Sequence, residues 1–278
     1  MNPMYHSPLY VPGDRPAMLE KAGDRGTDLI VIDLEDAVPI ASKAAARSLT
    51  VEAVPRLRGN GAKVGVRINS FMAEREADLI ALNDVELDAL MIPKATMAEI
   101  NTVAAANQVA ETDFIALIEN GQGLLDAPKI AAHPRVKRLA VGEADLAADL
   151  DMEAGDNDPA WIPSRALLVW ASSAAGIDGP IGPVFVDLRD LDELRRSTER
   201  LKGMGFGGRS AIHPAQVAII NEIFTPTSEE LTEARRYVSA YDSAVAKGHG
   251  VIVDESGRIV DEALVRRSRR LIAEYPTA

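Results

Sequence analysis

Eight short apolar runs, most of them followed by a segment rich in Ala, Glu or Arg, account for most of the chain. Such a run with β-branched residues predicts a buried strand, and intervening segments such as Arg15–Arg25, Ala41–Arg56 and Asp190–Met204 predict helices. The alternation favours an α/β fold of the (β/α)8 TIM-barrel type, which usually spans about 250 residues. A doubly wound open sheet is the alternative. The predicted strands are Pro8–Val11, Leu29–Leu34, Lys63–Ile68, Ala89–Ile92, Phe114–Ile118, Arg138–Val141, Pro183–Val186 and Arg209–Ile212.

The pattern changes after residue 224. There Thr227 or Ser228 is a strong N-cap for a long helix over Glu229–Ala246. A small hairpin within 251–260 and a basic helix, Glu262–Ile272, complete the chain. We therefore expect a TIM-barrel catalytic domain over residues 1–224 and a C-terminal helix–hairpin–helix extension over residues 225–278. The extension is too small to be an independent domain, so we expect it to pack on its own barrel or on a neighbouring subunit.

Composition narrows the possible partners. The chain has 42 acidic and 30 basic side chains, a net charge of −12, which argues against nucleic acid as a partner. It has no Cys, which excludes disulfides, thiolate nucleophiles and cysteine-ligated metals. Neither a signal peptide nor an apolar run of membrane-spanning length is evident, so we expect a cytoplasmic protein with no membrane partner.

Charged side chains follow nearly every predicted strand. In a (β/α)8 barrel the loops after the strands build the active site, so these side chains are candidates for function. Each one alone is better explained as the point where solvent begins, but their number favours a site. They are Asp14, Arg15, Glu35, Asp36, Arg67, Lys94, Glu119, Glu143, Asp145, Asp187 and His213.

Glu119 and Asp145 are the most informative of these acids. They follow two apolar runs that are separated by one compact helix, and a strand–helix–strand unit places its two strands parallel. Both carboxylates should therefore lie at the same edge of the sheet. Two carboxylates with a few waters suit Mg²⁺. The alternative is that either acid only caps the helix that follows it.

Arg67 ends an otherwise apolar predicted strand. A guanidinium there needs an anion, and its planar fork suits a carboxylate. That anion could be a ligand or a structural partner such as Glu35 or Asp36. These two acids could instead hold metal-bound water, and Arg15 could reach a phosphate or carboxylate. Gly142 would let the backbone approach a ligand closely.

Two other features are weaker. His213 is the one histidine at a predicted strand end, and a structural role is favoured for it. The segment Gly203–Gly208 satisfies the pattern GxGxxG, but it follows a helix and precedes a strand, the reverse of a dinucleotide-binding site. A nucleotide-binding open-sheet protein is therefore poorly supported.

Several motifs together resemble one family across essentially the whole chain. The chain is similar to the HpcH/HpaI aldolase and citrate lyase β-subunit family, in its CitE-like, acyl-CoA lyase branch. The motifs are VPGDRP (Val11–Pro16), DLIVIDLEDAV (Asp28–Val38), VRIN (Val66–Asn69), MIPKA (Met91–Ala95), LIENGQGLL (Leu117–Leu125), VGEADLAADL (Val141–Leu150), AIHPAQV (Ala211–Val217), FTPTSEEL (Phe224–Leu231) and GRIVDEALVRRSRR (Gly257–Arg270).

The resemblance implies a set of site residues. Glu119 and Asp145 would hold Mg²⁺, and Arg67 would bind the carboxylate of a 2-oxo acid. Asp261 matches an aspartate that acts as acid–base group in the site of a neighbouring subunit, which implies a homotrimer or hexamer. From its position alone Asp261 reads as a helix N-cap. With the resemblance in view, we predict that Arg67, Asp261, Glu35 and Asp36 are catalytic and that Arg67, Arg15, Gly142, Glu143 and Ala144 contact the substrate.

The predicted function is a Mg²⁺-dependent carbon–carbon lyase. Its substrate would be a 3-hydroxyacyl thioester of the citramalyl-CoA or malyl-CoA type, and its products acetyl-CoA and a 2-oxo acid. The alternatives are a citrate lyase β subunit acting on an acyl-carrier-protein thioester, thioester hydrolysis or acetate transfer on the same site, and a non-catalytic binding homologue.

Asn120 stands where the family usually has Thr or Ser, and the segment Asp151–Pro163 departs from the family, so the substrate does not transfer with the resemblance.

Overall fold

The structure is a computed structural model that describes residues 5–106, 112–153, 155, 159–254 and 257–276. The chain divides into two compact units, with the boundary between Phe224 and Thr225. Residues 154 and 156–158, within the segment Asp151–Pro163 that departs from the family, lie outside the described residues.

The larger unit is built on one sheet of eight parallel strands in sequential order, β1 to β8. A parallel bridge between Leu9 of β1 and Ala211, just after β8, joins the two edges of the sheet. Sequential parallel strands that meet again are the topology of a TIM-like barrel, so the predicted fold class is confirmed and the open sheet is excluded. The strands are β1 (Leu9–Pro12), β2 (Ile30–Asp33), β3 (Val64–Arg67), β4 (Ala89–Ile92), β5 (Asp113–Ile118), β6 (Val136–Val141), β7 (Ile181–Gly182) and β8 (Gly208–Arg209).

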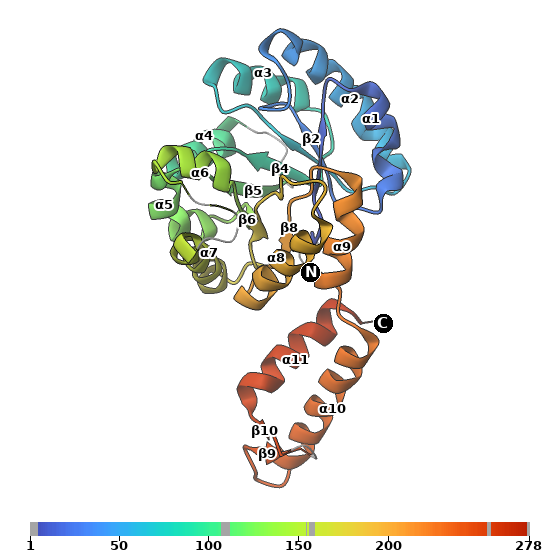
Figure 1. Cartoon of the computed structure of the whole chain (residues 1–278), viewed down its shortest axis with the longest axis vertical. Coiled ribbons are helices and arrows are strands. Elements are labelled where there is room, and N and C mark those ends of the chain that lie inside the picture. The colour runs from blue at the N-terminus through green and yellow to red at the C-terminus, as the bar shows by residue number, and fades with distance from the viewer. Residues whose placement is uncertain (1–4, 107–111, 154, 156–158, 255–256, 277–278) are drawn as a thin grey trace. The chain divides into compact units, whose positions relative to one another are not determined.

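Helices surround the strands (Figure 1). Their apolar faces pack on the outer side of the sheet, where one large buried cluster includes Leu57, Ile100 and Ile130. The helices are α1 (Pro16–Lys21), α2 (Lys43–Gly59), α3 (Met72–Leu82), α4 (Met97–Ala106), α5 (Gly121–Ala131), α6 (Glu143–Asp149), α7 (Ile162–Ala175), α8 (Leu191–Met204) and α9 (Pro214–Phe224), with the short 3-10 helices Ala22–Arg25, Ile40–Ser42 and Pro159–Trp161.

The strands are buried on both sides. A second cluster, which includes Val31, Met91 and Ile115, fills the barrel interior, and every residue of β2 and β4 is buried. Because parallel strands covered on both faces read as continuous apolar runs, the sequence located β1 to β6 within a few residues.

The prediction was wrong at the seventh strand. The run Pro183–Val186 is not a strand, and β7 is the pair Ile181–Gly182 just before it. A Cβ at Gly182 would lie 2.7 Å from the Leu201 side chain, so a larger residue would have to displace that side chain of α8. Pro183 then lacks the N–H that a central strand donates, and Val186 is 65% exposed in the loop. The eighth strand was likewise placed too late: β8 ends at Arg209.

The smaller unit has the predicted helix–hairpin–helix order. Helix α10 (Ser228–Val245) starts at Thr227, which forms a capping box with Glu230. The antiparallel strands β9 (Ile252–Val253) and β10 (Ile259–Val260) precede α11 (Glu262–Glu274). Tyr237, Tyr241, Val260 and Val265 form the small core of this unit.

Candidate functional site

Arg67 ends β3 and is paired in the sheet with Asp33, which ends β2. Its Nε donates to Asp33 Oδ1 and its Nη2 donates to Oδ2, both over 2.7 Å. The guanidinium carbon also lies 5.1 Å from the ring centre of Tyr10. Burial alone would lower the pKa of Arg67, but the hydrogen bonds and charge of Asp33 raise it overall. Arg67 is therefore held charged and in one orientation.

Glu35 and Asp36 also lie beside Arg67. Its Nη1 is 3.3 Å from Glu35 Oε2 and 3.3 Å from Asp36 Oδ2. Glu35 is only 4% exposed, and its charged form is stabilised by Arg67 and by the side chain of Ser70. Burial raises the pKa of Glu35 to about 7 in spite of Arg67. Keeping a buried carboxylate charged costs free energy unless a ligand, a water molecule or a cation contacts it.

Glu119 follows β5 and is 3% exposed. Its Oε1 accepts a hydrogen bond of 2.7 Å from the backbone N–H of Lys94. Burial, followed by the charge of Glu35, raises the pKa of Glu119 to about 8. A Cβ at Gly142 would lie 2.6 Å from Glu119 Oε2. Gly142 therefore leaves the space that the Glu119 carboxylate occupies.

Asp145 lies in the first turn of α6, and its side chain is 43% exposed. Its Oδ1 is 4.0 Å from Nζ of Lys94. The charge of Asp145 is one of the causes that raise the pKa of Glu119, which puts the two carboxylates within electrostatic range of each other. The structure thus brings Glu119, Asp145, Glu35 and Arg67 together at the carboxyl ends of the strands.

Glu143 has a different environment from its neighbour Asp145. Both oxygens of its buried carboxylate accept hydrogen bonds from Arg165 of α7, over 2.6 and 2.7 Å. This pair ties the start of α6 to α7, so the Glu143 side chain is engaged within the protein. Ala144 is exposed between them. A contact of Gly142, Glu143 or Ala144 with substrate stays a prediction.

The other predicted residues lie outside the Arg67 network. Arg15 precedes α1 with its side chain 62% exposed, and its Nε is 3.4 Å from Asp14 Oδ1. Asn120 caps α5 by accepting from the Gly123 N–H over 2.6 Å. Asp261, in the smaller unit, caps α11 by accepting from the Leu264 N–H over 3.0 Å. That cap was expected from position alone, and the catalytic role of Asp261 stays a prediction.

Sequence reasoning missed Asp33 as the main partner of Arg67. The residue was read as part of a strand interior, and Glu35 and Asp36 were considered instead. A signal was present, because a lone Asp inside the run LIVIDL needs a buried cationic or N–H partner.

The carboxylate pair fits a magnesium ion. Mg²⁺ takes one or two carboxylates and keeps water or substrate oxygens in its other positions. Within residues 5–106, 112–153, 155, 159–254 and 257–276, no group of three or more His, Asp or Glu side chains is arranged to hold a metal. With this preference, Glu119 and Asp145 would supply two oxygen ligands to Mg²⁺ and leave positions for water and substrate.

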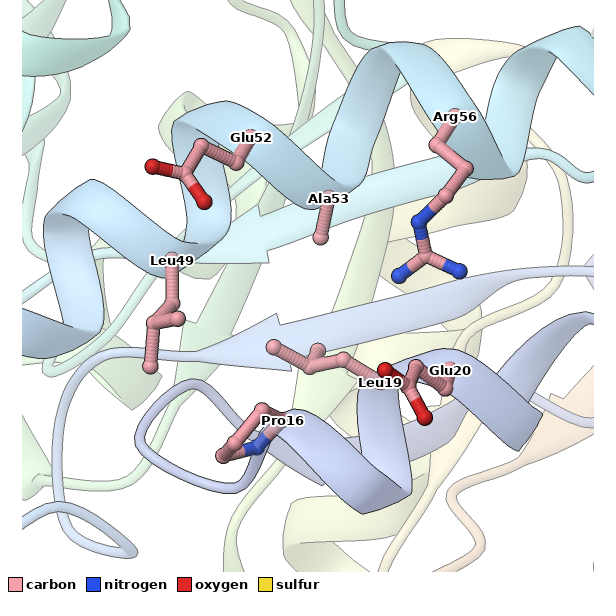
Figure 2. A pocket seen from close by; sticks show the side chains of 7 residues that line it. All are labelled: Pro16, Leu19, Glu20, Leu49, Glu52, Ala53 and Arg56. Carbon is pink, nitrogen blue, oxygen red and sulfur yellow. The ribbon is translucent and has the colours of Figure 1, made fainter.

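A groove on the outer helices is separate from this cluster. Figure 2 shows side chains of α1 and α2 facing each other across it. Its volume is about 370 Å³, and none of its lining residues belongs to the predicted site. The lining residues are Pro16, Leu19, Glu20, Leu49, Glu52, Ala53 and Arg56.

In the part of the chain that the structure describes, no helix combines the length and the apolar character needed to cross a bilayer.

A TIM-like barrel with an acidic cluster and one oriented arginine at its strand ends has the architecture of a barrel enzyme. Comparison with known proteins is more specific. The family model described as HpcH/HpaI aldolase/citrate lyase matches residues 6–214, and the chain belongs to this family. The family resemblance found in the sequence motifs is confirmed.

Individual relatives share most of their length with this chain. A (3S)-malyl-CoA thioesterase of Cereibacter sphaeroides is 36% identical, covering 97% of this chain and 94% of the relative. An L-malyl-CoA/beta-methylmalyl-CoA lyase of the same species is 33% identical, covering 96% and 93%. The crystal structure of CitE from Mycobacterium tuberculosis, in complex with magnesium, acetoacetate and coenzyme A, superposes with a TM-score of 0.80 at 27% identity, covering 99% of this chain and all of that one (100%).

Proposed function

We propose that the protein is a Mg²⁺-dependent lyase that cleaves a malyl-CoA-type 3-hydroxyacyl thioester into acetyl-CoA and a 2-oxo acid such as glyoxylate. The observation that supports this proposal most strongly is the excess of buried carboxylate groups around Arg67, at the carboxyl ends of the strands. Glu35 and Glu119 are both buried there, and their pKa values are raised to about 7 and about 8. A divalent cation would stabilise both in their charged forms. Relatives named for malyl-CoA, and a related structure with magnesium and coenzyme A, support the same reading.

When bound between Glu119 and Asp145, Mg²⁺ would act as a Lewis acid toward the oxygen of the reacting carbon. Arg67 would donate from Nη1, because its 3.3 Å contacts with Glu35 and Asp36 are longer than the 2.7 Å bonds that hold Nε and Nη2 on Asp33. The Nη1 edge of the Arg67 guanidinium suits a substrate carboxylate and the negative charge that develops during cleavage. Glu35, whose Oε2 faces the same Nη1, is placed to accept hydrogen bonds from water near the cation.

Cleavage requires a base for the substrate hydroxyl. Removal of that proton forms the carbonyl of the 2-oxo acid, the bond between C2 and C3 breaks, and its electron pair passes to the thioester as an enolate. Protonation of the enolate gives acetyl-CoA. We assign the base to Asp261 of a neighbouring copy in a homotrimer or hexamer. Its carboxylate is exposed and accepts one N–H of its own helix, so an acceptor position remains open.

Thioester hydrolysis is the second candidate, and the 36% identity to a malyl-CoA thioesterase favours it. The same site would then direct water to the thioester carbonyl, and the products would be malate and free CoA. An acyl-carrier-protein thioester, as for a citrate lyase β subunit, is a further possible substrate.

The test is to incubate the purified protein with malyl-CoA, citramalyl-CoA and citryl-CoA, with Mg²⁺ and with EDTA, and to identify the products. Acetyl-CoA plus an oxo acid, formed only with Mg²⁺, is the expected result. Free CoA plus an intact hydroxy acid would establish the hydrolase instead. Turnover of none of the three would turn the search to acyl-carrier thioesters, and binding of Mg²⁺ and oxo acid without turnover of any thioester would indicate a non-catalytic homologue.

A further inference from the structure

Lys94 contacts both members of the carboxylate pair. It follows β4, its backbone N–H donates to Glu119 Oε1 over 2.7 Å, and its Nζ lies 4.0 Å from Asp145 Oδ1. Its side chain is 45% exposed, which leaves the ammonium free to move. One residue therefore positions the buried acid through its backbone and faces the accessible acid through its charge.

The backbone of Lys94 is strained. Its φ is +47°, in the left-handed region, and in the described part of the chain only one other residue that is not glycine has a positive φ, Asp151. This conformation is unfavourable for lysine, and glycine would adopt it freely. The strained conformation holds the N–H on Glu119. A glycine could make that hydrogen bond as well, so the hydrogen bond does not explain why the side chain is lysine.

We propose that the ammonium of Lys94 is the resident counter-cation of Asp145. In the metal-free protein it competes with a divalent cation for that carboxylate, and in the loaded protein it pairs with the carboxylate of the 2-oxo acid. This inference rests on the proposed function, because it takes Glu119 and Asp145 as the metal ligands. By this inference, Lys94 weakens the binding of Mg²⁺ and strengthens the binding of the 2-oxo acid. A lysine with only a structural role would have neither effect.

The variant Lys94→Met removes the charge and keeps a long unbranched side chain. Mg²⁺ should bind the metal-free variant more tightly than the wild type, by roughly two- to fivefold, because a positive charge beside Asp145 is lost. Glyoxylate or pyruvate should bind the Mg²⁺-loaded variant more weakly by a similar factor. Both differences should shrink in about 1 M salt, where charges are screened beyond about 3 Å.

Isothermal titration calorimetry of Mg²⁺, and then of the oxo acid, measures both affinities without relying on turnover. Lys63→Met is the matched control, because Lys63 pairs with Asp88 over 3.1 Å before β3 rather than after β4. It should change neither affinity, and Lys94→Arg should retain the wild-type pattern. If Lys94→Met does not fold, Lys94→Gln makes the same test.

Two results would overturn the inference. Unchanged or weaker Mg²⁺ binding by Lys94→Met, with normal binding by the wild type, rejects the role of Lys94 and leaves the proposed function intact. Failure of the wild type to bind Mg²⁺ at all rejects both.

Discussion

The two ends of strands β3 and β4 carry very different arrangements of charge. Before the strands, Asp88 accepts hydrogen bonds from Arg58 and from the Val64 N–H, each over 2.9 Å, and from Lys63 over 3.1 Å. Arg58 is also paired with Glu86 over 2.6 Å. At this end two acids meet two cations, and the Asp88 carboxylate is fully used.

After strands β2 to β6, acids outnumber cations, even when the buried Lys43, whose Nζ donates to the Leu34 and Glu35 carbonyls, is counted. In the ion pairs described there, Asp33, Glu35 and Asp36 share Arg67, and Asp145 lies near Lys94. Glu119 is buried among them and accepts the Lys94 N–H. If the cluster served only stability, its negative charges would be balanced by cations, as they are around Asp88. The imbalance is costly in the metal-free protein and supports the proposal that a cation belongs to the working state.

Removing a carboxylate of the pair should have the largest effect. Glu119→Gln or Asp145→Asn should weaken Mg²⁺ binding and turnover by more than about 100-fold, the upper range for residues that only support metal ligands. Calorimetry with Mg²⁺ and the thioester assay measure the two losses. Full Mg²⁺ affinity in both variants would show that the acidic excess is not a metal site.

Arg67→Lys should act on the oxo acid and spare the metal. Lysine keeps the charge but cannot form the two-bond contact with Asp33, so the edge that faces substrate loses its orientation. Oxo-acid affinity should fall by about 10- to 100-fold, the range for a hydrogen bond to a charged group. Mg²⁺ affinity should stay close to that of the wild type, and an equal loss of both would mean that Arg67 supports the whole cluster.

The metal-free protein should lose stability as the pH rises. Glu35 and Glu119 have pKa values of about 7 and about 8 in the fold, against an ordinary value of 4.5, so the folded state binds their protons more tightly. Their contribution to stability is complete below pH 4.5 and is lost as the pH rises through about 7 and 8. The midpoint of thermal unfolding should therefore fall by several degrees across this window, and Mg²⁺ should restore it at high pH. Glu119→Gln should flatten the profile, and a wild-type midpoint that rises with pH would contradict this account.

The smallest effect is expected from a substitution before β3 and β4, where the charges around Asp88 are balanced. Asp88→Asn removes partners from Arg58 and Lys63 but keeps an oxygen that can accept the Val64 N–H. The free energy of unfolding should fall by about 1 kcal/mol, as for partly exposed ion pairs. Denaturant titration measures this loss, and Mg²⁺ affinity should not change. A change in Mg²⁺ affinity would remove the contrast between the two ends.

Much of the barrel could be predicted because its strands are buried on both faces and therefore read as apolar runs. The prediction failed at β7, because a strand of only Ile181 and Gly182 leaves no apolar run in the sequence. The carboxylate pair was predictable from chain order alone, since two parallel strands in sequence end side by side. Asp33 was missed: a lone Asp in an apolar run predicts a buried partner, but only the pairing of β2 with β3 identifies Arg67 as that partner. The link between Glu143 and Arg165 likewise depends on packing between α6 and α7.

The most direct test of the account is to locate a divalent cation. Crystals soaked in Mn²⁺ as a substitute for Mg²⁺ should give one anomalous difference peak bound by Glu119 and Asp145, and the peak should vanish in Glu119→Gln. A peak at another group of acids, or none at the strand ends in crystals of the wild type, would contradict the claim that the unbalanced carboxylates form a metal site.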